Sequence, residues 1–77
     1  MPKTHFNIQD QFLNQVRKAR IEVEATLQSG DLVRGHIRSF DSFCIILENP
    51  DAIMLLYKHA LSMIRPAESG VNIPGLI

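Results

Sequence analysis

The chain has 77 residues, and its eight lysine and arginine residues balance eight aspartate and glutamate residues. A chain of this length forms one small domain with a thin core, which often needs disulfides, a metal or self-association for stability. Cys44 is the only cysteine and the three histidines are scattered, which excludes a disulfide framework and argues against a metal site. Self-association is therefore expected.

Membrane insertion and secretion are not expected. No stretch approaches the roughly 20 apolar residues of a membrane-spanning helix. The N-terminus, from Met1 to His5, lacks the apolar segment of a secretion signal. We therefore expect a cytoplasmic protein without a membrane partner, and we expect residues 1–6 to be a flexible N-terminus.

An amphipathic helix is predicted over residues 8–19, because apolar residues from Ile8 onward recur at the spacing of one helix face. Asn7 or Asp10 could cap or charge its start. Three cations fall within four residues at its end, namely Arg17, Lys18 and Arg20. They can compensate the helix dipole or form a basic patch, and both interpretations stay open.

Five strands are predicted after the helix. Alternating apolar and polar residues indicate a half-buried strand over 21–28, and a second strand over 32–40 carries Gly35, a sign of a strong bend or a close backbone approach. The apolar run after Ser42 predicts a third strand, 43–48, buried on both faces. The last two strands are expected at 52–57 and 60–65, and Pro66 ends the fifth.

The predicted fold is a small, strongly bent five-stranded antiparallel barrel with an N-terminal helix. A flat sheet of such strands would leave long exposed edges. An open barrel still has two edges, and pairing between the edges of neighbouring subunits would close a ring. The segment 67–77 contains two glycines and a proline and is expected to be a short flexible tail.

The junction between the last two strands, Tyr57-Lys58-His59-Ala60, suggests a binding site. A cation and an imidazole at a tight junction suit an anionic ligand, above all a phosphate. The alternative is a solvated polar turn. In a ring the pair would be repeated around an axis and would gain avidity for a polymer.

Several motifs, in their order and spacing, resemble the bacterial Sm-like RNA chaperone family Hfq over residues 7–66. They are Gln9-Asp10, Phe12-Leu13-Asn14, Arg17-Lys18-Ala19-Arg20, Gly35, Ser39-Phe40-Asp41, Phe43 and Tyr57-Lys58-His59-Ala60. The resemblance implies a homohexameric ring that binds small regulatory RNAs and messenger RNAs, promotes their pairing and affects RNA stability. It implies no catalysis and no cofactor.

The family's proximal uridine pocket falls on Gln9, Phe43, Lys58 and His59. Phe43 can stack on a base, Gln9 and Lys58 can bond a uracil edge, and His59 can bond ribose or phosphate. The alternative for Phe43 is packing in the core. Ser42 replaces a pocket glutamine common in the family, and its hydroxyl could weaken base contact or act through water.

Two further RNA surfaces follow from the resemblance. The lateral rim falls on Asn14, Arg17, Lys18, Arg20 and Phe40. The distal, adenine-binding face falls on Thr26, Gly30, Asp31 and Arg34. Thr26 stands where an aromatic is usual and Asp31 where a neutral or basic residue is usual, so adenine binding is expected to be weak or altered, unless Arg34 compensates.

Two other function classes are considered. One is a ring or small-barrel protein-interaction module without RNA-chaperone activity, which the neutral net charge and altered distal face favour. The other is a hydrolase with His59 as base. Ser42, Ser62 and Asp41 are present, but their spacing matches no known catalytic arrangement.

Overall fold

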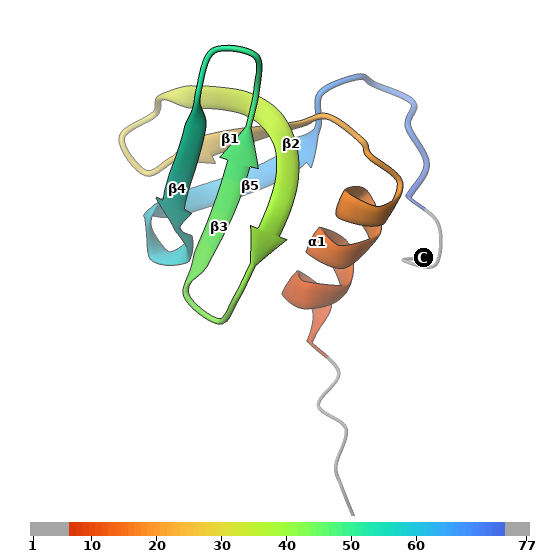
Figure 1. The fold of residues 1–77 in the computed structure, drawn as a ribbon, viewed down its shortest axis with the longest axis horizontal. Coiled ribbons are helices and arrows are strands. Elements are labelled where there is room, and N and C mark those ends of the chain that lie inside the picture. Colours follow the sequence, from red (N-terminus) through yellow and green to blue (C-terminus); the bar gives the residue numbers. More distant parts are fainter. Residues whose placement is uncertain (1–6, 74–77) are drawn as a thin grey trace, which may run out of the picture.

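One helix and five strands follow one another along residues 7–73, the part of the chain that the computed structural model describes (Figure 1). The predicted fold class, a helix followed by a bent antiparallel sheet, is confirmed. The predicted flexible N-terminus, 1–6, lies outside the described residues. The elements are α1 Ile8–Lys18, β1 Val23–Leu27, β2 Leu32–Phe40, β3 Cys44–Glu48, β4 Ile53–Tyr57, the 3-10 turn η1 Lys58–Ala60 and β5 Leu61–Pro66.

α1 begins with a side-chain cap. The Asn7 side-chain oxygen accepts a hydrogen bond from the Asp10 backbone N–H at 3.3 Å, so Asn7 is the capping residue and Asp10 lies in the first turn. Leu13 and Val16 form its buried face. α1 has 11 residues, and no helix within residues 7–73 is long and apolar enough to cross a membrane.

The sheet is antiparallel with the strand order β4-β3-β2-β1-β5. β2 belongs to both halves of it. Its residues up to Gly35 pair with β1, and its residues from His36 onward pair with β3. The long β2 ribbon curves between the two halves (Figure 1). The bend therefore falls at the glycine that the sequence singled out.

Gly35 lies at this bend because no side chain fits there. A Cβ atom at this position would lie 2.6 Å from the Glu48 backbone oxygen, which is far inside van der Waals contact. Gly35 is buried, and its register partner on β1 is Val23. The prediction of a close backbone approach is confirmed, and β3 is the strand that approaches.

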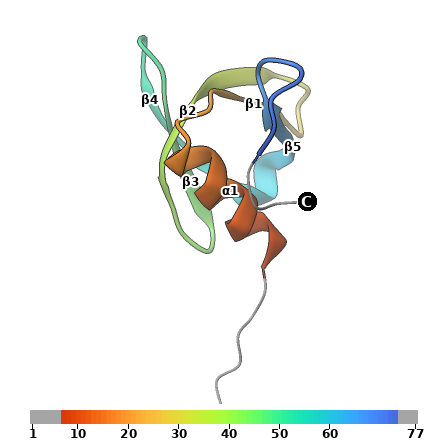
Figure 2. The same ribbon diagram turned by 90° about the vertical axis from the view of Figure 1, so that its right-hand side faces the viewer.

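The core fills the inner side of the bend. One cluster of buried residues joins α1 to β1, β2 and β3, and Figure 2 shows α1 lying across the space enclosed by the curved sheet. The prediction that the run from Phe43 to Leu47 is buried on both faces is wrong. Ile45 and Leu47 are buried, but Cys44 and Ile46 are only partly covered. A bent sheet has only one inner face.

The two edges of the sheet are β4 and β5. Alternate residues of β4, Ile53, Leu55 and Tyr57, are more than half exposed, and Met63 on β5 is 50% exposed. Within residues 7–73, each edge also carries backbone groups that face no partner strand. Both edges are therefore suited to pairing.

The segment after β5 returns toward the domain. The Ala67 N–H donates to the Glu22 carbonyl at 2.9 Å, and Ile73 packs against the core cluster. The first part of the predicted flexible tail therefore lies against the domain, whereas residues 74–77 are outside the described range.

Replacing Gly35 by alanine should destabilise the domain, because the new methyl group must displace the β3 backbone. We expect Gly35→Ala to lower the free energy of unfolding by about 1 to 3 kcal/mol in urea titrations followed by circular dichroism. Ser39→Ala, an exposed change on the same strand, is the control and should stay within about 0.5 kcal/mol of wild type. Equal stability of the two variants would contradict the role given to Gly35.

Candidate nucleic-acid interface

The turn between β2 and β3 is organised by Asp41. Its carboxylate accepts hydrogen bonds from the backbone N–H groups of Phe43 and Cys44, both at 2.8 Å. These two hydrogen bonds, from Phe43 first and Cys44 second, lower the pKa of Asp41, and the nearby Lys58 charge acts in the same direction. The side chain of Asp41 therefore holds the turn in one conformation.

Phe43 extends from this turn into solvent. It is 75% exposed, so the alternative that it packs in the core is wrong. Ser42, the preceding residue, is exposed as well. An exposed phenylalanine on a fixed turn offers a flat apolar surface on which a base can stack.

The 3-10 turn η1 lies beside Phe43. The Lys58 N–H donates to the Phe43 carbonyl at 2.7 Å, which joins the two turns directly. His59 follows on η1 and is exposed, with its ring 5.7 Å from that of Tyr57. The structure thus brings Ser42, Phe43, Lys58 and His59 to the same end of the sheet.

The Lys58 side chain points toward the first turn of α1. Its Nζ lies 3.2 Å from Asp10 Oδ1 and 5.6 Å from the centre of the Phe40 ring. Only 15% of the side chain is exposed. Gln9 and Lys58 both line a groove of about 290 Å³ between α1 and β5. Gln9 therefore joins the predicted proximal residues, and Asp10 is a partner that the sequence did not reveal.

The predicted rim residues gather along α1 and the end of β2. Arg17 donates to the Asn14 side-chain oxygen at 2.6 Å, and its guanidinium lies 6.0 Å from the centre of the Phe40 ring. Phe40 thus lies between Arg17 of the rim and Lys58 of the proximal group. Lys18 and Arg20 are exposed at the end of the helix.

Arg20 ends α1 in a strained conformation. Its φ of 56° lies in the left-handed region, where glycine is the usual residue. The Arg20 N–H donates to the Arg17 carbonyl, and the Ile21 N–H donates to the Val16 carbonyl, at 3.1 and 3.0 Å. An arginine here costs about 1 to 2 kcal/mol of backbone strain compared with glycine.

The predicted distal residues lie around the turn between β1 and β2. Thr26 is partly buried, between its register partners Leu32 and Met63. Gly30 has a φ of 98°, and Asp31 accepts a hydrogen bond from the Ser29 hydroxyl at 3.1 Å. This surface carries an acid and aliphatic side chains, so it lacks a ring for stacking.

Glu24 forms ion pairs with two arginines near that surface. The alternating pattern of β1 predicted that this glutamate would face solvent. It is 6% exposed, and its carboxylate binds Arg34 Nε at 3.3 Å and Arg65 Nη2 at 2.6 Å. Both arginines are its direct register partners, on β2 and β5. Arg34 is therefore engaged within the sheet. The sequence carries no signal of this burial, because it depends on the register of three strands.

No group of three or more histidine, cysteine, aspartate or glutamate residues within residues 7–73 could hold a metal ion.

The structure forms a basic and aromatic surface around Phe43, Lys58, Phe40 and Arg17. Arginine, lysine and exposed aromatic groups are the side chains that contact phosphates and bases. Together with the bent five-stranded sheet and the N-terminal helix, they define a small Sm-like domain.

The chain belongs to the Hfq family, since the family model described as Hfq protein matches residues 8–72. An RNA-binding protein Hfq from Fervidobacterium nodosum is 47% identical over 68 residues, which cover 88% of this chain and 77% of that protein. Another, from Pseudothermotoga lettingae, is 50% identical over 62 residues, covering 80% of this chain and 68% of that protein.

Solved structures agree. A crystal structure of the pleiotropic translational regulator Hfq has a TM-score of 0.72 and 31% identity, with 75% of this chain and 97% of that chain covered. An Hfq protein from Anabaena has the same fold, with a TM-score of 0.69, 22% identity, and coverage of 75% and 93%. The Hfq family is not a family of enzymes, so the hydrolase alternative built on His59 is wrong.

The β2–β3 turn should lose its order at acid pH. Because the pKa of Asp41 is lower in the folded chain than in the unfolded one, the stabilisation is present above the unfolded pKa and is lost as pH falls through the folded pKa. In NMR titrations, the amide protons of Phe43 and Cys44 should shift with a midpoint below the ordinary aspartate pKa.

The Ala52 amide is the control, since it donates to the neutral Asn49 side chain at 2.9 Å rather than to a carboxylate. It should not follow the Asp41 midpoint. A midpoint for Phe43 and Cys44 at or above the ordinary aspartate value would contradict this account of the turn.

Arg20→Gly should stabilise the domain by roughly 0.5 to 1 kcal/mol, because relief of left-handed strain exceeds the extra backbone entropy that glycine loses on folding. Thermal and urea unfolding would measure the change. Lys18→Gly is the matched control, two residues earlier within the helix, and should destabilise by about 1 kcal/mol. Destabilisation by both variants would refute the strain at Arg20.

Proposed function

We propose that this chain is a cytoplasmic RNA chaperone that binds uridine-rich single strands on the proximal face of a homohexameric ring and promotes pairing of small regulatory RNAs with messenger RNAs. Relatives at 45 to 50% identity are named RNA-binding proteins. The observation that carries the proposal is the 75% exposed Phe43, fixed by Asp41 and joined through its carbonyl to Lys58.

The proximal residues offer complementary chemistry to a uridine. Phe43 supplies the stacking surface, and Gln9 and Lys58 supply donors for the oxygens of the uracil edge. In the unbound chain Lys58 is held by Asp10, so a uracil oxygen would share or replace that carboxylate as its partner. His59, exposed beside them, suits ribose or phosphate, and the Ser42 hydroxyl can bond the base directly or through water.

Assembly into a ring is supported by the two open edges. β4 and β5 lie at opposite ends of the strand order, and β4 exposes Ile53, Leu55 and Tyr57. Pairing β4 of one subunit with β5 of the next would satisfy the backbone groups and cover these side chains. Six copies would repeat the proximal residues around one axis, which raises the avidity for a uridine strand that touches several of them.

The rim residues would serve the pairing step. Arg17, Lys18 and Arg20 are exposed on each subunit. Repeated around a ring, they form a belt of cations that lowers the repulsion between the phosphates of two strands. Phe40, which lies between Arg17 and Lys58, connects this belt to the proximal pocket.

The distal surface should contribute little to adenine binding. Asp31 repels phosphate, Thr26 gives no stacking surface, and Arg34 is bound to Glu24. We therefore propose that uridine strands bind more tightly than adenine strands. The alternative of a ring without RNA-chaperone activity, which the neutral net charge favours, is decided by the same experiment.

Binding of labelled hexauridine should be measured by fluorescence anisotropy at one fixed salt concentration. Phe43→Ala should weaken it by roughly 5-fold to 150-fold, since stacking contributes about 1 to 3 kcal/mol per base. His59→Ala should also weaken binding. Leu32→Ala, which removes another exposed apolar side chain, is the control and should bind like wild type.

An unlabelled adenine repeat should compete poorly with hexauridine. Native mass spectrometry of each variant should give six times the 8.7 kDa chain mass, so that lost binding is not mistaken for lost assembly. Assembled wild type that binds no hexauridine would refute the proposal and favour the interaction module. Adenine binding equal to or tighter than uridine binding would refute the assignment of the faces.

A further inference from the structure

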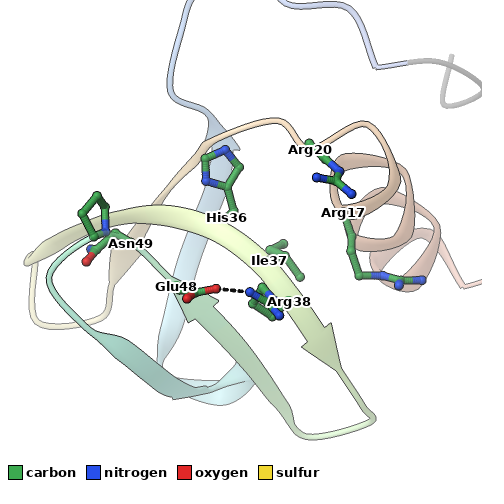
Figure 3. A pocket seen from close by; sticks show the side chains of 8 residues that line it. Arg17, Arg20, His36, Ile37, Arg38, Glu48 and Asn49 are labelled. Atoms are coloured by element: carbon green, nitrogen blue, oxygen red, sulfur yellow. Dashed lines mark hydrogen bonds and ion pairs between the residues drawn. The ribbon is translucent and has the colours of Figure 1, made fainter.

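A second groove, of about 720 Å³, lies outside the proximal residues, between the end of α1 and the strands β2 and β3. Figure 3 shows Arg17 and Arg20 coming from the helix side, and His36 and Arg38 coming from β2. The groove is lined by Arg17, Arg20, His36, Ile37, Arg38, Glu48, Asn49 and Pro50.

The alternation of β2 explains which side chains reach the groove surface. Ile37 is buried in the core, while its neighbours His36 and Arg38 are exposed on the other face. Glu48 is the register partner of His36 on β3, and its carboxylate accepts a hydrogen bond from Arg38. The basic surface of α1 therefore continues onto β2, beyond the rim residues that the family resemblance implies.

The charge in the groove is uneven. Three arginines line it, against the single carboxylate of Glu48. The Arg38 side chain is 65% exposed, so guanidinium donors stay accessible beside the ion pair, whereas the Glu48 side chain is only 34% exposed. The Glu48 carboxylate binds one side of the Arg38 guanidinium, where the oxygen of an anionic ligand could also bind. Glu48 therefore competes with such a ligand for Arg38.

The lining indicates the class of ligand. No phenylalanine, tyrosine or tryptophan lines the groove, and its apolar members are Ile37, which is buried in the core, and the single exposed Pro50. The groove therefore lacks the large apolar side chains that bury an apolar peptide, and its lining is dominated by cationic donors. Planar arginine forks with an imidazole and an amide beside them suit phosphate oxygens instead.

We propose that this groove binds backbone phosphates of RNA without base preference, through Arg38 and His36 together with Arg17 and Arg20, and that Glu48 weakens this binding. The proposal rests on the proposed function and extends it to RNA outside the uridine strand. The new elements are RNA contact by His36 and Arg38 of β2 and a weakening of that contact by the Glu48 carboxylate of β3.

Two probes separate the groove from the proximal pocket. One is hexauridine alone, and the other is an RNA stem-loop that ends in hexauridine. For wild type, the stem-loop should bind more tightly. The ratio of the dissociation constant for hexauridine to that for the stem-loop measures the contribution of the extra phosphates. The same ratio is then measured for Arg38→Gln, Glu48→Gln and Arg65→Gln at several salt concentrations.

Arg38→Gln should lower the ratio by roughly 5-fold to 8-fold at about 0.1 M salt, because losing one phosphate contact reduces the slope of log affinity against log salt by about 0.7 to 0.9. Glu48→Gln should raise the ratio. Arg65→Gln, which removes an exposed arginine outside the groove, should leave it unchanged. Hexauridine alone should bind all three variants like wild type.

The proposal is overturned if Arg38→Gln keeps the wild-type ratio, or if Arg65→Gln lowers the ratio equally, which would show a general effect of net charge. A Glu48→Gln ratio below that of wild type would also overturn it. Failure of the proposed function looks different, since wild type would then bind neither probe.

Discussion

The close approach of Gly35 to the Glu48 backbone is the constraint on which the rest of the structure depends. It lets β2 bend and pair with β1 on one side and β3 on the other. The bend wraps the sheet around one small core, which α1 shares with β1, β2 and β3. The strand order leaves β4 and β5 as the two edges of the sheet, and these are the surfaces that we propose pair between subunits.

Within residues 7–73, carboxylates hold four of the seven lysine and arginine side chains. Asp10 holds Lys58, Glu24 holds Arg34 and Arg65, and Glu48 holds Arg38. Within residues 7–73, the cations that end α1, Arg17, Lys18 and Arg20, are in no ion pair. Zero net charge therefore does not mean a neutral surface, because Asp10, Glu24 and Glu48 pair with cations elsewhere in the domain and the helix end stays basic.

Short-range patterns in the sequence were enough to predict the helix, the strands and the bend in β2. Asn7, one of the two residues expected to cap or charge the start of α1, is its cap, because capping acts over a few residues. Gly35 marks the bend, as a glycine within a strand often does. β1 is shorter than predicted, since Ile21 completes the hydrogen bonds that end α1.

Features that depend on neighbours distant in sequence could not be predicted. The burial of Glu24 needs arginines from two other strands in register, and alternation within β1 gives no sign of them. The exposure of Phe43 follows from the Asp41 turn, whereas its sequence neighbours suggested a buried run. The basic groove containing Arg38 arises where α1 ends beside β2 and β3, which no single segment reveals.

The central claim is that a uridine strand lies on the turn formed by Asp41, Phe43 and the adjacent η1. The most direct measurement is photocrosslinking of a 4-thiouridine hexamer to the assembled protein, with the modified peptides identified by mass spectrometry. The account predicts crosslinks at Phe43 and at Lys58 or His59. Crosslinks confined to the segment from Thr26 to Arg34 would contradict it.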